Sequence, residues 1–417
     1  MALPEQGMGK DEVVAALLAK REHDVRWQDG RTFGMVYDGG ESLHELLDEV
    51  APLFLHDNAL NTLAFPSLAE IQKDVVGIVA DLLHGAPDAA GFMTSGGTES
   101  ILMAVKAARE RGRKERGVER PNIVAPESAH AAFHKGASYF GLEMRKIPVR
   151  PDWRADVDAT ADAVDDDTVL VVGSAPQYPQ GVIDPIPDLA ALAAERGANF
   201  HTDACMGGFV LPFMEQLGYE VPPWDFRVPG VTSISADLHK LGYAPKGASV
   251  IMHRDKDLRR YQTFVFDGWL GGFYASPNMQ GTRPGLPMAL AWATLHHLGL
   301  DGYLRLTRLT VDTRQRMVAG VRAIDGVTVL GEPEAHLVAI SAAPGWEDRV
   351  DVFAVGDALL ARGWFHDRQG PPDTLHATVS AGNAPVIDDY LRDLRECVTE
   401  VLGTRADDRS TNYATLE

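Results

Sequence analysis

This sequence has very little cysteine and no long apolar run. Cys205 and Cys397 are the two cysteines in 417 residues, and two cysteines cannot build a disulfide framework, which indicates a reducing compartment. No run approaches the roughly 20 apolar residues that a membrane helix needs. The first residues, Met1 to Glu5, do not combine a basic start with an apolar stretch. We therefore expect a soluble, cytoplasmic protein with neither a signal peptide nor a membrane anchor.

Basic side chains are scarce relative to acidic ones. The 39 Lys and Arg residues face 59 Asp and Glu residues, which gives a formal net charge of −20. Such an acidic surplus disfavours nucleic acid and anionic membrane surfaces as general partners. A phosphate-bearing small molecule remains compatible with it, because a phosphate site needs only a few local donors. We expect a small-molecule ligand, no nucleic acid and no metal.

The chain is longer than one hydrophobic core usually spans, and its patterning divides it into three parts. We expect an N-terminal helical arm over residues 1–60, a large domain over 61–300 and a small α+β domain over 301–417. In the large part, short apolar runs alternate with helical stretches such as Ser100–Arg111 and Pro187–Arg196. This alternation predicts an α/β fold with a mostly parallel sheet covered by helices. The expected strands are 122–125, 169–172, 199–202, 231–235 and 249–252. The polar tail from Arg405 is expected to fray.

A glycine-rich segment, Thr94–Ser100, directly precedes the helical pattern of Ile101–Arg111. Gly96 and Gly97 let the backbone approach an anion closely, and the helix start supplies N–H groups and a positive dipole end. Thr98 adds a hydroxyl donor. The segment predicts a phosphate cradle, although taken alone it is equally typical of an ordinary turn with a capping Thr.

Two further residues fit the same chemistry. Asp203 ends an apolar run, where a carboxylate can hold a protonated ring nitrogen, as in enzymes that use pyridoxal 5'-phosphate. Lys240 lies 37 residues later, at the end of another strand-like segment. A lysine amine whose pKa is lowered by a pocket forms a Schiff base with an aldehyde. Taken singly, a capping Asp and a solvated Lys are the commoner interpretations.

His130, in the turn that follows residues 122–125, is placed to stack on a planar ring, although a lone His is more often a polar surface or core residue. The interpretation therefore depends on the combination. A phosphate cradle, a stacking His, a ring-nitrogen Asp and a Schiff-base Lys occur in the order that this one cofactor chemistry requires.

These residues lie in motifs that resemble the sphingosine-1-phosphate lyase branch of the pyridoxal-phosphate-dependent group II decarboxylases, from about residue 34 to about residue 400. The matching segments are Phe92–Met103, Glu127–Phe140, Gln180–Pro185, Asp203–Phe209, Asp225–Ser249 and Trp269–Pro284. The resemblance implies the fold-type I, aminotransferase-like fold, in which a mostly parallel seven-stranded sheet has helices on both faces and a small C-terminal α+β domain follows. It also implies a homodimer with shared active sites.

By position in the motifs, the resemblance gives each residue a role. Gly96, Gly97 and Thr98 would bind the cofactor phosphate with help from His239, while His130 would stack on the ring. Asp203 would pair with the ring nitrogen, and Lys240 would carry the Schiff base. Three further residues would act near the site: Tyr274 on a loop that reaches toward it, and Lys246 and Arg283 beside the substrate.

The chain differs from the branch where a substrate phosphate is expected to bind. The usual Asn-Pro-Leu-His reads Asn58-Ala59-Leu60-Asn61 here, so Asn61 replaces a histidine. We expect a lyase that cleaves a (phosphorylated) amino alcohol by retro-aldol chemistry to an aldehyde and an amine. The alternative is a decarboxylase or related biosynthetic enzyme acting on another amino acid or amine. A catalytically silent protein is disfavoured by the intact Lys240, Asp203 and His130.

Overall fold

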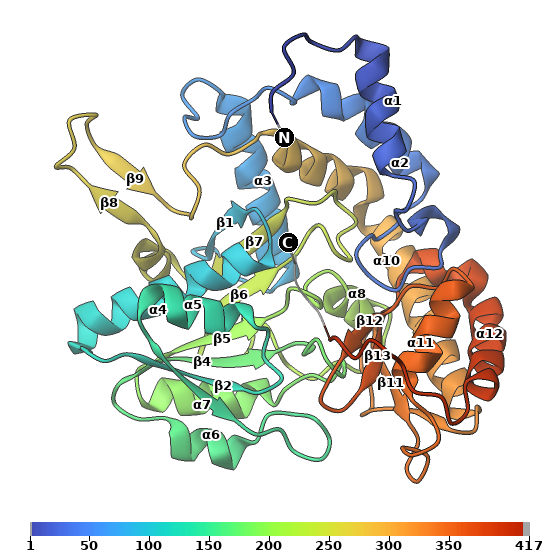
Figure 1. Cartoon of the computed structure of the whole chain (residues 1–417). Coiled ribbons are helices and arrows are strands. Elements are labelled where there is room, and N and C mark those ends of the chain that lie inside the picture. The colour runs from blue at the N-terminus through green and yellow to red at the C-terminus, as the bar shows by residue number, and fades with distance from the viewer. Residues whose placement is uncertain (1, 412–417) are drawn as a thin grey trace.

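The large part of the chain folds around one sheet whose neighbouring strands are not neighbours in the sequence. The structure is a computed structural model that describes residues 2–411. The order of the seven strands is β1-β7-β6-β5-β4-β2-β3 (Figure 1). The strands from β6 to β3 run parallel, and β7 is antiparallel to both β6 and β1. Their bounds are β1 (Ala90–Thr94), β2 (Asn122–Pro126), β3 (Glu143–Ile147), β4 (Thr168–Ser174), β5 (Asn199–Asp203), β6 (Val231–Ala236) and β7 (Ser249–His253).

Alternate side chains of the central strands enter two different hydrophobic cores. Ile123 of β2 and Val172 of β4 pack with α4 (Gly97–Arg116) and α5 (Ala132–Phe140) on one face. Val124 and Val171, one residue along, join the core on the other face. Successive side chains of a strand point to opposite faces, so a strand buried on both faces can carry a continuous apolar run, as Val169–Val172 of β4 does. The helices of the second face include α3 (Pro66–Leu82), α6 (Val157–Ala163), α7 (Ile186–Glu195) and α8 (Leu211–Gln216). The expected sheet with helices on both faces is confirmed.

The sequence pattern identified five of these strands and missed β1 and β3. In β1 the sequence Ala-Gly-Phe-Met-Thr runs directly into the glycine-rich segment, which hides the end of the strand. In β3, an edge strand, Glu143, Arg145 and Lys146 are polar. An edge strand pairs on one side only and tolerates such residues, so it lacks the apolar run of a central strand.

The small C-terminal part has its own sheet and core. The strand order is β10 (Val327–Val329), β11 (Leu337–Ala342), β13 (Thr374–Thr378) and β12 (Asp367–Gln369), all antiparallel. Helix α11 (Val352–Ala361) packs against β11 and β13, and α12 (Ile387–Glu400) packs against α11 and α10. The helix α10 (Leu286–Arg322) leads into it and is interrupted at Gly299, whose φ of 52° and ψ of −173° are not helical. Phe33, from the N-terminal part, lies in this core between Trp364 and Tyr390. The expected α+β domain is therefore present.

The N-terminal part contains two short helices, and a hairpin projects from the large part. Helix α1 (Lys10–Lys20) buries none of its side chains, whereas α2 (Glu41–Val50) buries Leu43. The hairpin of β8 (Phe264–Phe266) and β9 (Tyr274–Ser276) extends away from the rest of the chain (Figure 1). The remaining short elements are α9 (Lys256–Arg259) and the 3-10 turns Trp27–Asp29, Ala51–Leu53, Arg260–Gln262 and Ala381–Val386.

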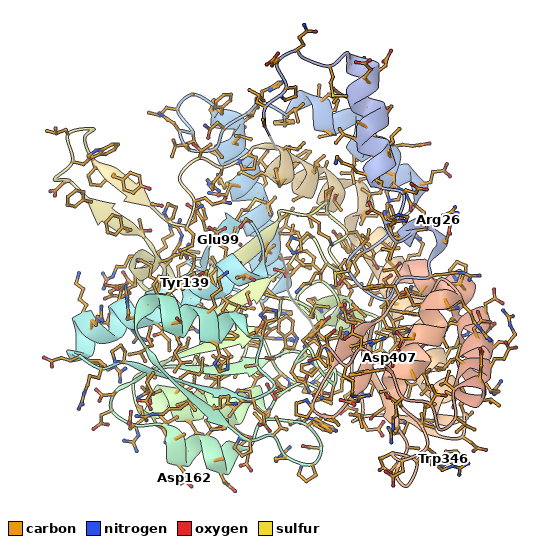
Figure 2. The ribbon with its side chains drawn as sticks, in the orientation of Figure 1. Arg26, Glu99, Tyr139, Asp162, Trp346 and Asp407 are labelled. Carbon is orange, nitrogen blue, oxygen red and sulfur yellow. The ribbon has the colours of Figure 1, made fainter. Side chains whose placement is uncertain are left out.

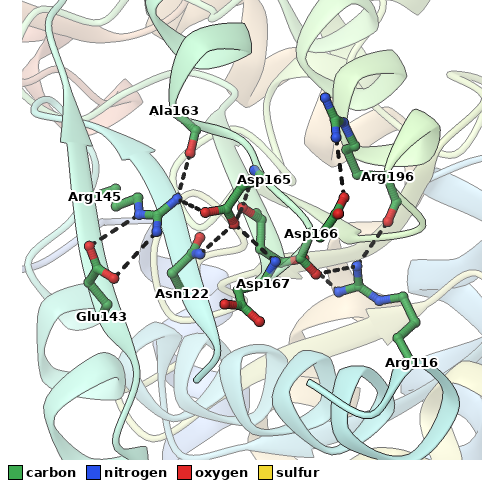
Figure 3. Close-up of polar contacts among 10 residues, drawn as sticks. Arg116, Asn122, Glu143, Arg145, Ala163, Asp165, Asp166, Asp167 and Arg196 are labelled. Atoms are coloured by element: carbon green, nitrogen blue, oxygen red, sulfur yellow. Dashed lines mark hydrogen bonds and ion pairs between the residues drawn. The ribbon is translucent and has the colours of Figure 1, made fainter. Parts of the chain in front are cut away.

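A polar cluster joins β2, β3 and the start of β4 at the end of the sheet opposite the glycine-rich segment (Figure 3). Asp165 accepts hydrogen bonds from Asn122 Nδ2 at 2.9 Å and Arg145 Nη1 at 2.6 Å. Burial opposes its ionisation, but these hydrogen bonds and the charge of Arg145 lower the pKa of Asp165 to about 2. The ionised carboxylate thus ties the edge strand to its neighbours.

The expectation that the tail frays is wrong for its described part. Ala406 N and Arg409 Nη1 both donate to the carboxylate of Asp351, at 3.0 and 2.6 Å, and Arg409 also pairs with Asp373. Charge-assisted hydrogen bonds of this kind hold a polar segment without an apolar anchor, which a composition argument does not detect. The last part of the expected tail, 412–417, lies outside the described residues.

Candidate active site

The predicted cofactor residues gather at one edge of the large sheet. Asp203 ends β5, His130 follows β2, and Lys240 follows β6. Because β1 and β6 are each antiparallel to β7, β1 runs in the same direction as β6, and the glycine-rich segment follows its end at the same edge. Open α/β sheets bind ligands outside the carboxyl ends of their strands. Residues far apart in the sequence are thus brought to one place by the direction of the strands.

A cavity of about 280 Å³ lies at this edge, and all seven predicted cofactor residues line it. The lining residues are Ser95, Gly96, Gly97, Thr98, Glu99, Ile101, His130, Asp203, Cys205, Asp237, His239 and Lys240.

The wall of the cavity formed by the start of α4 cannot carry side chains. A Cβ on Gly97 would lie 2.7 Å from Asp237 Oδ2 and 2.7 Å from Cys205 Sγ, and a Cβ on Gly96 would lie 3.2 Å from the imidazole of His239. Glycine at both positions leaves the first N–H groups of α4 exposed to the cavity, where an anion binds well. The observed packing fits a phosphate group at this helix end.

Lys240 makes an ion pair that the sequence analysis missed. Its Nζ lies 2.9 Å from Asp237 Oδ2, and the Asp237 side chain is 1% exposed. Burial alone would favour the neutral acid, but the charge of Lys240 and the neighbouring His239 hold the pKa of Asp237 well below its usual range. Asp237 precedes Lys240 by three residues in Ser-Ala-Asp-Leu-His-Lys. An acidic residue directly after an apolar strand was the sequence signal that could have identified it.

His239 is fixed by backbone groups. Its Nδ1 accepts hydrogen bonds from the N–H groups of Gly247 and Ala248, at 3.3 and 3.2 Å. A nitrogen that accepts two hydrogen bonds carries no proton, so we assign the proton to Nε2, which lies 3.6 Å from Asp237 Oδ2. The imidazole can therefore donate toward the cavity.

Asp203 is held at the floor of the cavity by two donors. Its Oδ1 accepts from Cys205 N and from Ser235 Oγ, both at 3.1 Å. The same Ser235 hydroxyl lies 3.1 Å from Nε2 of His201, and burial lowers the pKa of His201 to about 4. A neutral His201 leaves the Asp203 carboxylate without a competing cation below it.

His130 is positioned by its own turn. Its Nδ1 accepts from Ala132 N at 3.1 Å. Burial lowers the pKa of His130, and the opposing charge of Asp203 does not outweigh it. A neutral imidazole in this place fits the predicted stacking on a planar ring.

Lys246 lies in a second cavity of about 140 Å³ that also reaches Lys240. Its Nζ donates to the carbonyl of His239 at 2.8 Å and lies 4.7 Å from the ring centre of Tyr37. The residue as a whole is exposed in the single chain, but protein atoms crowd the surroundings of its amine. The resulting desolvation and the charge of Lys240 lower the pKa of Lys246 to about 8. The sequence analysis missed other lining residues of this cavity, namely Met35, Tyr37, Tyr178, Met206, Asp367 and Thr378.

Three predicted site residues are not brought to these cavities by the single chain. Tyr274 lies on β9 against Phe264 and Trp269 of the projecting hairpin. Asn61 uses its side-chain oxygen to accept from Leu63 N at 2.9 Å. Arg283 lines a separate cavity of about 240 Å³ on the other side of Ser95.

The fold and this constellation define a class. The carboxyl edge of the parallel sheet brings together a lysine amine, a hydrogen-bonded carboxylate, a neutral imidazole and a helix start without side chains. These groups fit the aldehyde, ring nitrogen, ring face and phosphate of pyridoxal phosphate, respectively. The molecule is thus a fold-type I, pyridoxal-phosphate-dependent enzyme, and the predicted fold class and cofactor are confirmed.

Comparison with known proteins gives the family. The model of the pyridoxal-dependent decarboxylase conserved domain matches residues 22–343, and the chain belongs to this family. A sphingosine-1-phosphate lyase of Arabidopsis thaliana is 41% identical over 96% of this chain and 74% of its own length. The solved structure of a Burkholderia pseudomallei sphingosine-1-phosphate lyase is 40% identical, with a TM-score of 0.91 over 96% of this chain and 92% of that one. A probable L-tyrosine/L-aspartate decarboxylase of Methanothrix thermoacetophila is 37% identical over 89% of this chain and 91% of its length.

Neither a membrane-spanning helix nor a metal-binding cluster occurs among the described residues. Within residues 2–411, no helix combines enough length with enough apolar character to cross a membrane. In the same range, no group of three or more His, Cys, Asp and Glu side chains is arranged to hold a metal ion.

Our first prediction concerns the cofactor-bearing lysine. Reduction of the holoenzyme with borohydride should fix the cofactor on Lys240, because its amine is the one that faces both Asp237 and the cavity. Peptide mapping by mass spectrometry measures the position. Label on Lys246 instead would overturn the assignment.

The second prediction concerns Asp203. Asp203→Asn should retain the cofactor but lower kcat by roughly 10²- to 10⁴-fold, because a neutral amide cannot hold a proton on the ring nitrogen. Absorbance of the bound cofactor and steady-state kinetics measure the two effects separately. A near wild-type kcat would show that Asp203 only caps the turn to Cys205.

Proposed function

We propose that this enzyme is a carbon–carbon lyase that cleaves a phosphorylated long-chain amino alcohol into an aldehyde and a phosphorylated amine. The observation that carries the proposal is the 40–41% identity to sphingosine-1-phosphate lyases over 96% of the chain. It is supported by the arrangement of Lys240, Asp203 and His130 around one cavity.

The proposed chemistry assigns each residue a proton or a binding role. When bound, pyridoxal phosphate supplies the electron sink that stabilises the carbanion left at the substrate's Cα. Asp203 keeps the ring nitrogen protonated, and His130 covers the ring. Lys246 takes the proton of the substrate's β-hydroxyl. As that O–H becomes a carbonyl, the Cα–Cβ bond breaks, its electron pair stays on Cα, and the aldehyde leaves. One proton, equivalent to the one that Lys246 took, is then added at Cα to give the amine product.

A decarboxylase is the second candidate function, and two observations favour it. Asn61 is neutral and engaged with Leu63 N, so it offers a substrate phosphate less than a protonated histidine would. One of the relatives reported above is a probable amino-acid decarboxylase. Lys246 and Arg283 do not compensate together, because they line different cavities.

We propose that the protein is a homodimer with composite active sites. We also propose that it is located in the cytoplasm. The hairpin that carries Tyr274 exposes large apolar side chains, with Trp269 58%, Leu270 107% and Phe273 72% exposed. Apolar side chains gathered on a projecting element are typical of an interface. A second subunit that covers this hairpin would receive Tyr274 near its own site. The proposed division of the chain into an N-terminal arm, a large domain and a small domain at residues 60 and 300 is compatible with such a homodimer.

Product analysis tests the function. With a phosphorylated long-chain amino alcohol we expect an aldehyde, and with aromatic or acidic amino acids we expect no CO₂. We also expect kcat/KM to favour the phosphorylated over the unphosphorylated substrate, and Asn61→His to increase that preference by several fold. Asn61→Ala is the control that removes only the turn to Leu63. Release of CO₂ without aldehyde would establish the decarboxylase instead.

The pH dependence tests Lys246. Its neutral amine is the proton acceptor, so kcat should rise with pH through a step near the pKa of about 8. Lys246→Met should remove this step and lower kcat by roughly 10²- to 10⁴-fold. The exposed Lys73 provides the matched control, and Lys73→Met should retain both. A step that persists in Lys246→Met would assign the proton transfer to another group.

Light scattering tests the assembly. At micromolar concentration we expect about twice the chain mass of 45.3 kDa. Leu270→Asp, at the tip of the hairpin, should shift the equilibrium toward monomer and lose activity in parallel. A fully active monomer would exclude composite sites.

A further inference from the structure

The base of the projecting hairpin returns to the edge of the active site. After β9 the chain passes through Pro277 and Met279 before it reaches α10. The Pro277 carbonyl accepts from Gln262 Nε2 at 2.5 Å, and Gln262 is itself held by His253 Nε2 at 2.8 Å. The Met279 N–H donates to Glu99 Oε1 at 2.8 Å. The hairpin base is therefore attached to the start of α4.

The same carboxylate also holds the phosphate cradle. Glu99 Oε2 accepts from both N and Oγ of Ser95, at 2.7 and 2.8 Å. The residue is 6% exposed, and in Figure 2 it lies on the side of the molecule from which the hairpin projects. One oxygen of Glu99 thus binds the cradle, and the other binds the hairpin base.

A carboxylate in this place has an electrostatic cost. It lies in the first turn of α4, where the cofactor's phosphate would also bind, and like charges repel. Arg283 is the nearby cation, and the charge of Glu99 partly offsets the lowering of its pKa by burial. An amide or hydroxyl would cap Ser95 without repelling a phosphate. Neither has two acceptor oxygens that can receive N–H groups from opposite sides.

We propose that Glu99 is a positioning residue that links the phosphate cradle, Ser95–Thr98, to the base of the hairpin. Phosphate binding orders the cradle, the ordered Ser95 fixes the Glu99 carboxylate, and the carboxylate fixes Met279. The hairpin carries Tyr274. Cofactor binding in one subunit therefore fixes the position of the hairpin that completes the active site of the other subunit. This last step rests on the homodimer proposed above.

Hydrogen exchange tests the link without any substrate. In the wild type, cofactor binding should slow amide exchange over residues 264–281. Glu99→Gln keeps the shape but has one acceptor oxygen, so it cannot serve Ser95 and Met279 together. In this variant, exchange of the hairpin base in the holoenzyme should rise by roughly ten- to a hundredfold, which is the worth of a hydrogen bond to a charged group. The exposed Glu70 supplies the control, and Glu70→Gln should behave like wild type.

Cofactor affinity separates positioning from simple capping. If Glu99 positions the hairpin, Glu99→Gln should bind the cofactor at least as tightly as wild type, because a negative charge near the phosphate is gone, while kcat at saturating cofactor falls. If Glu99 only caps the cradle, affinity should fall, and saturating cofactor should restore kcat and the hairpin protection. That second result would overturn the proposal. Glu99→Asp, which keeps the charge but is too short to bridge, should show the same loss of protection, and protection retained in both variants would also overturn it.

Mixed dimers locate the effect. In a dimer of one Lys240→Ala subunit and one Glu99→Gln subunit, the working lysine belongs to the Glu99→Gln subunit. The hairpin that completes its site comes from the Lys240→Ala subunit, whose Glu99 is intact. This dimer should be active. In a dimer of a wild-type subunit and a Lys240→Ala, Glu99→Gln double variant, the working lysine belongs to the wild-type subunit. Its site receives the loosened hairpin of the double variant, so kcat should fall by roughly ten- to a hundredfold. The opposite pattern would show that Glu99 acts within its own subunit. If no substrate of the proposed class is turned over, the exchange result still decides the link, so failure of the proposed function remains distinguishable.

Discussion

The site depends on the ion pair between Asp237 and Lys240, which is buried at the carboxyl edge of the sheet. A carboxylate that is 1% exposed is costly unless a cation compensates it, and removal of one partner leaves an unpaired buried charge. The pair therefore fixes the position of the Lys240 amine at the edge of the cavity. It also explains the neighbouring sequence, because Gly97 must lack a side chain to leave room for Asp237. His239 must direct a proton-bearing nitrogen toward the same carboxylate.

The direction of the strands brings this pair together with the other site residues. Four loops contribute, and each follows a strand that points to the same edge. The polar side chains inside the central strands, such as His201 and Ser235, hydrogen-bond to one another, whereas the carboxylates Asp203 and Asp237 lie at the carboxyl ends of β5 and β6, where they line the cavity. The acidic chain, with a net charge of −20, still places Lys240 in the cavity at the glycine-rich helix start and Lys246 in a second cavity that also reaches Lys240. Local geometry, and not overall charge, produces a site for an anionic ligand.

The sequence allowed prediction of the residues whose types are required by the chemistry. Gly96, Gly97, Asp203 and Lys240, which line one cavity in the structure, could be predicted because each has a proposed role that few other residue types can fill. Tyr37 and Asp367 could not, because they approach Lys240 from the N-terminal part and from the small domain, and no local pattern reports contacts over such sequence distances. The strand β3 was missed for a related reason, since pairing on one side removes the apolar run that identifies a buried strand.

The position of Tyr274 could not be derived from its local sequence. The glycines around it predict a loop that reaches toward the site, and the structure places Tyr274 on a hairpin that projects from the rest of the chain (Figure 1). A hairpin of two short strands is at most marginally stable by itself, and this one has Leu270 fully exposed at its tip. Its geometry must therefore be set from its base, where Gln262 and Glu99 hold Pro277 and Met279. Because Glu99 also belongs to α4, whose start is the proposed phosphate site, the projecting hairpin is anchored at the element that is proposed to bind the cofactor.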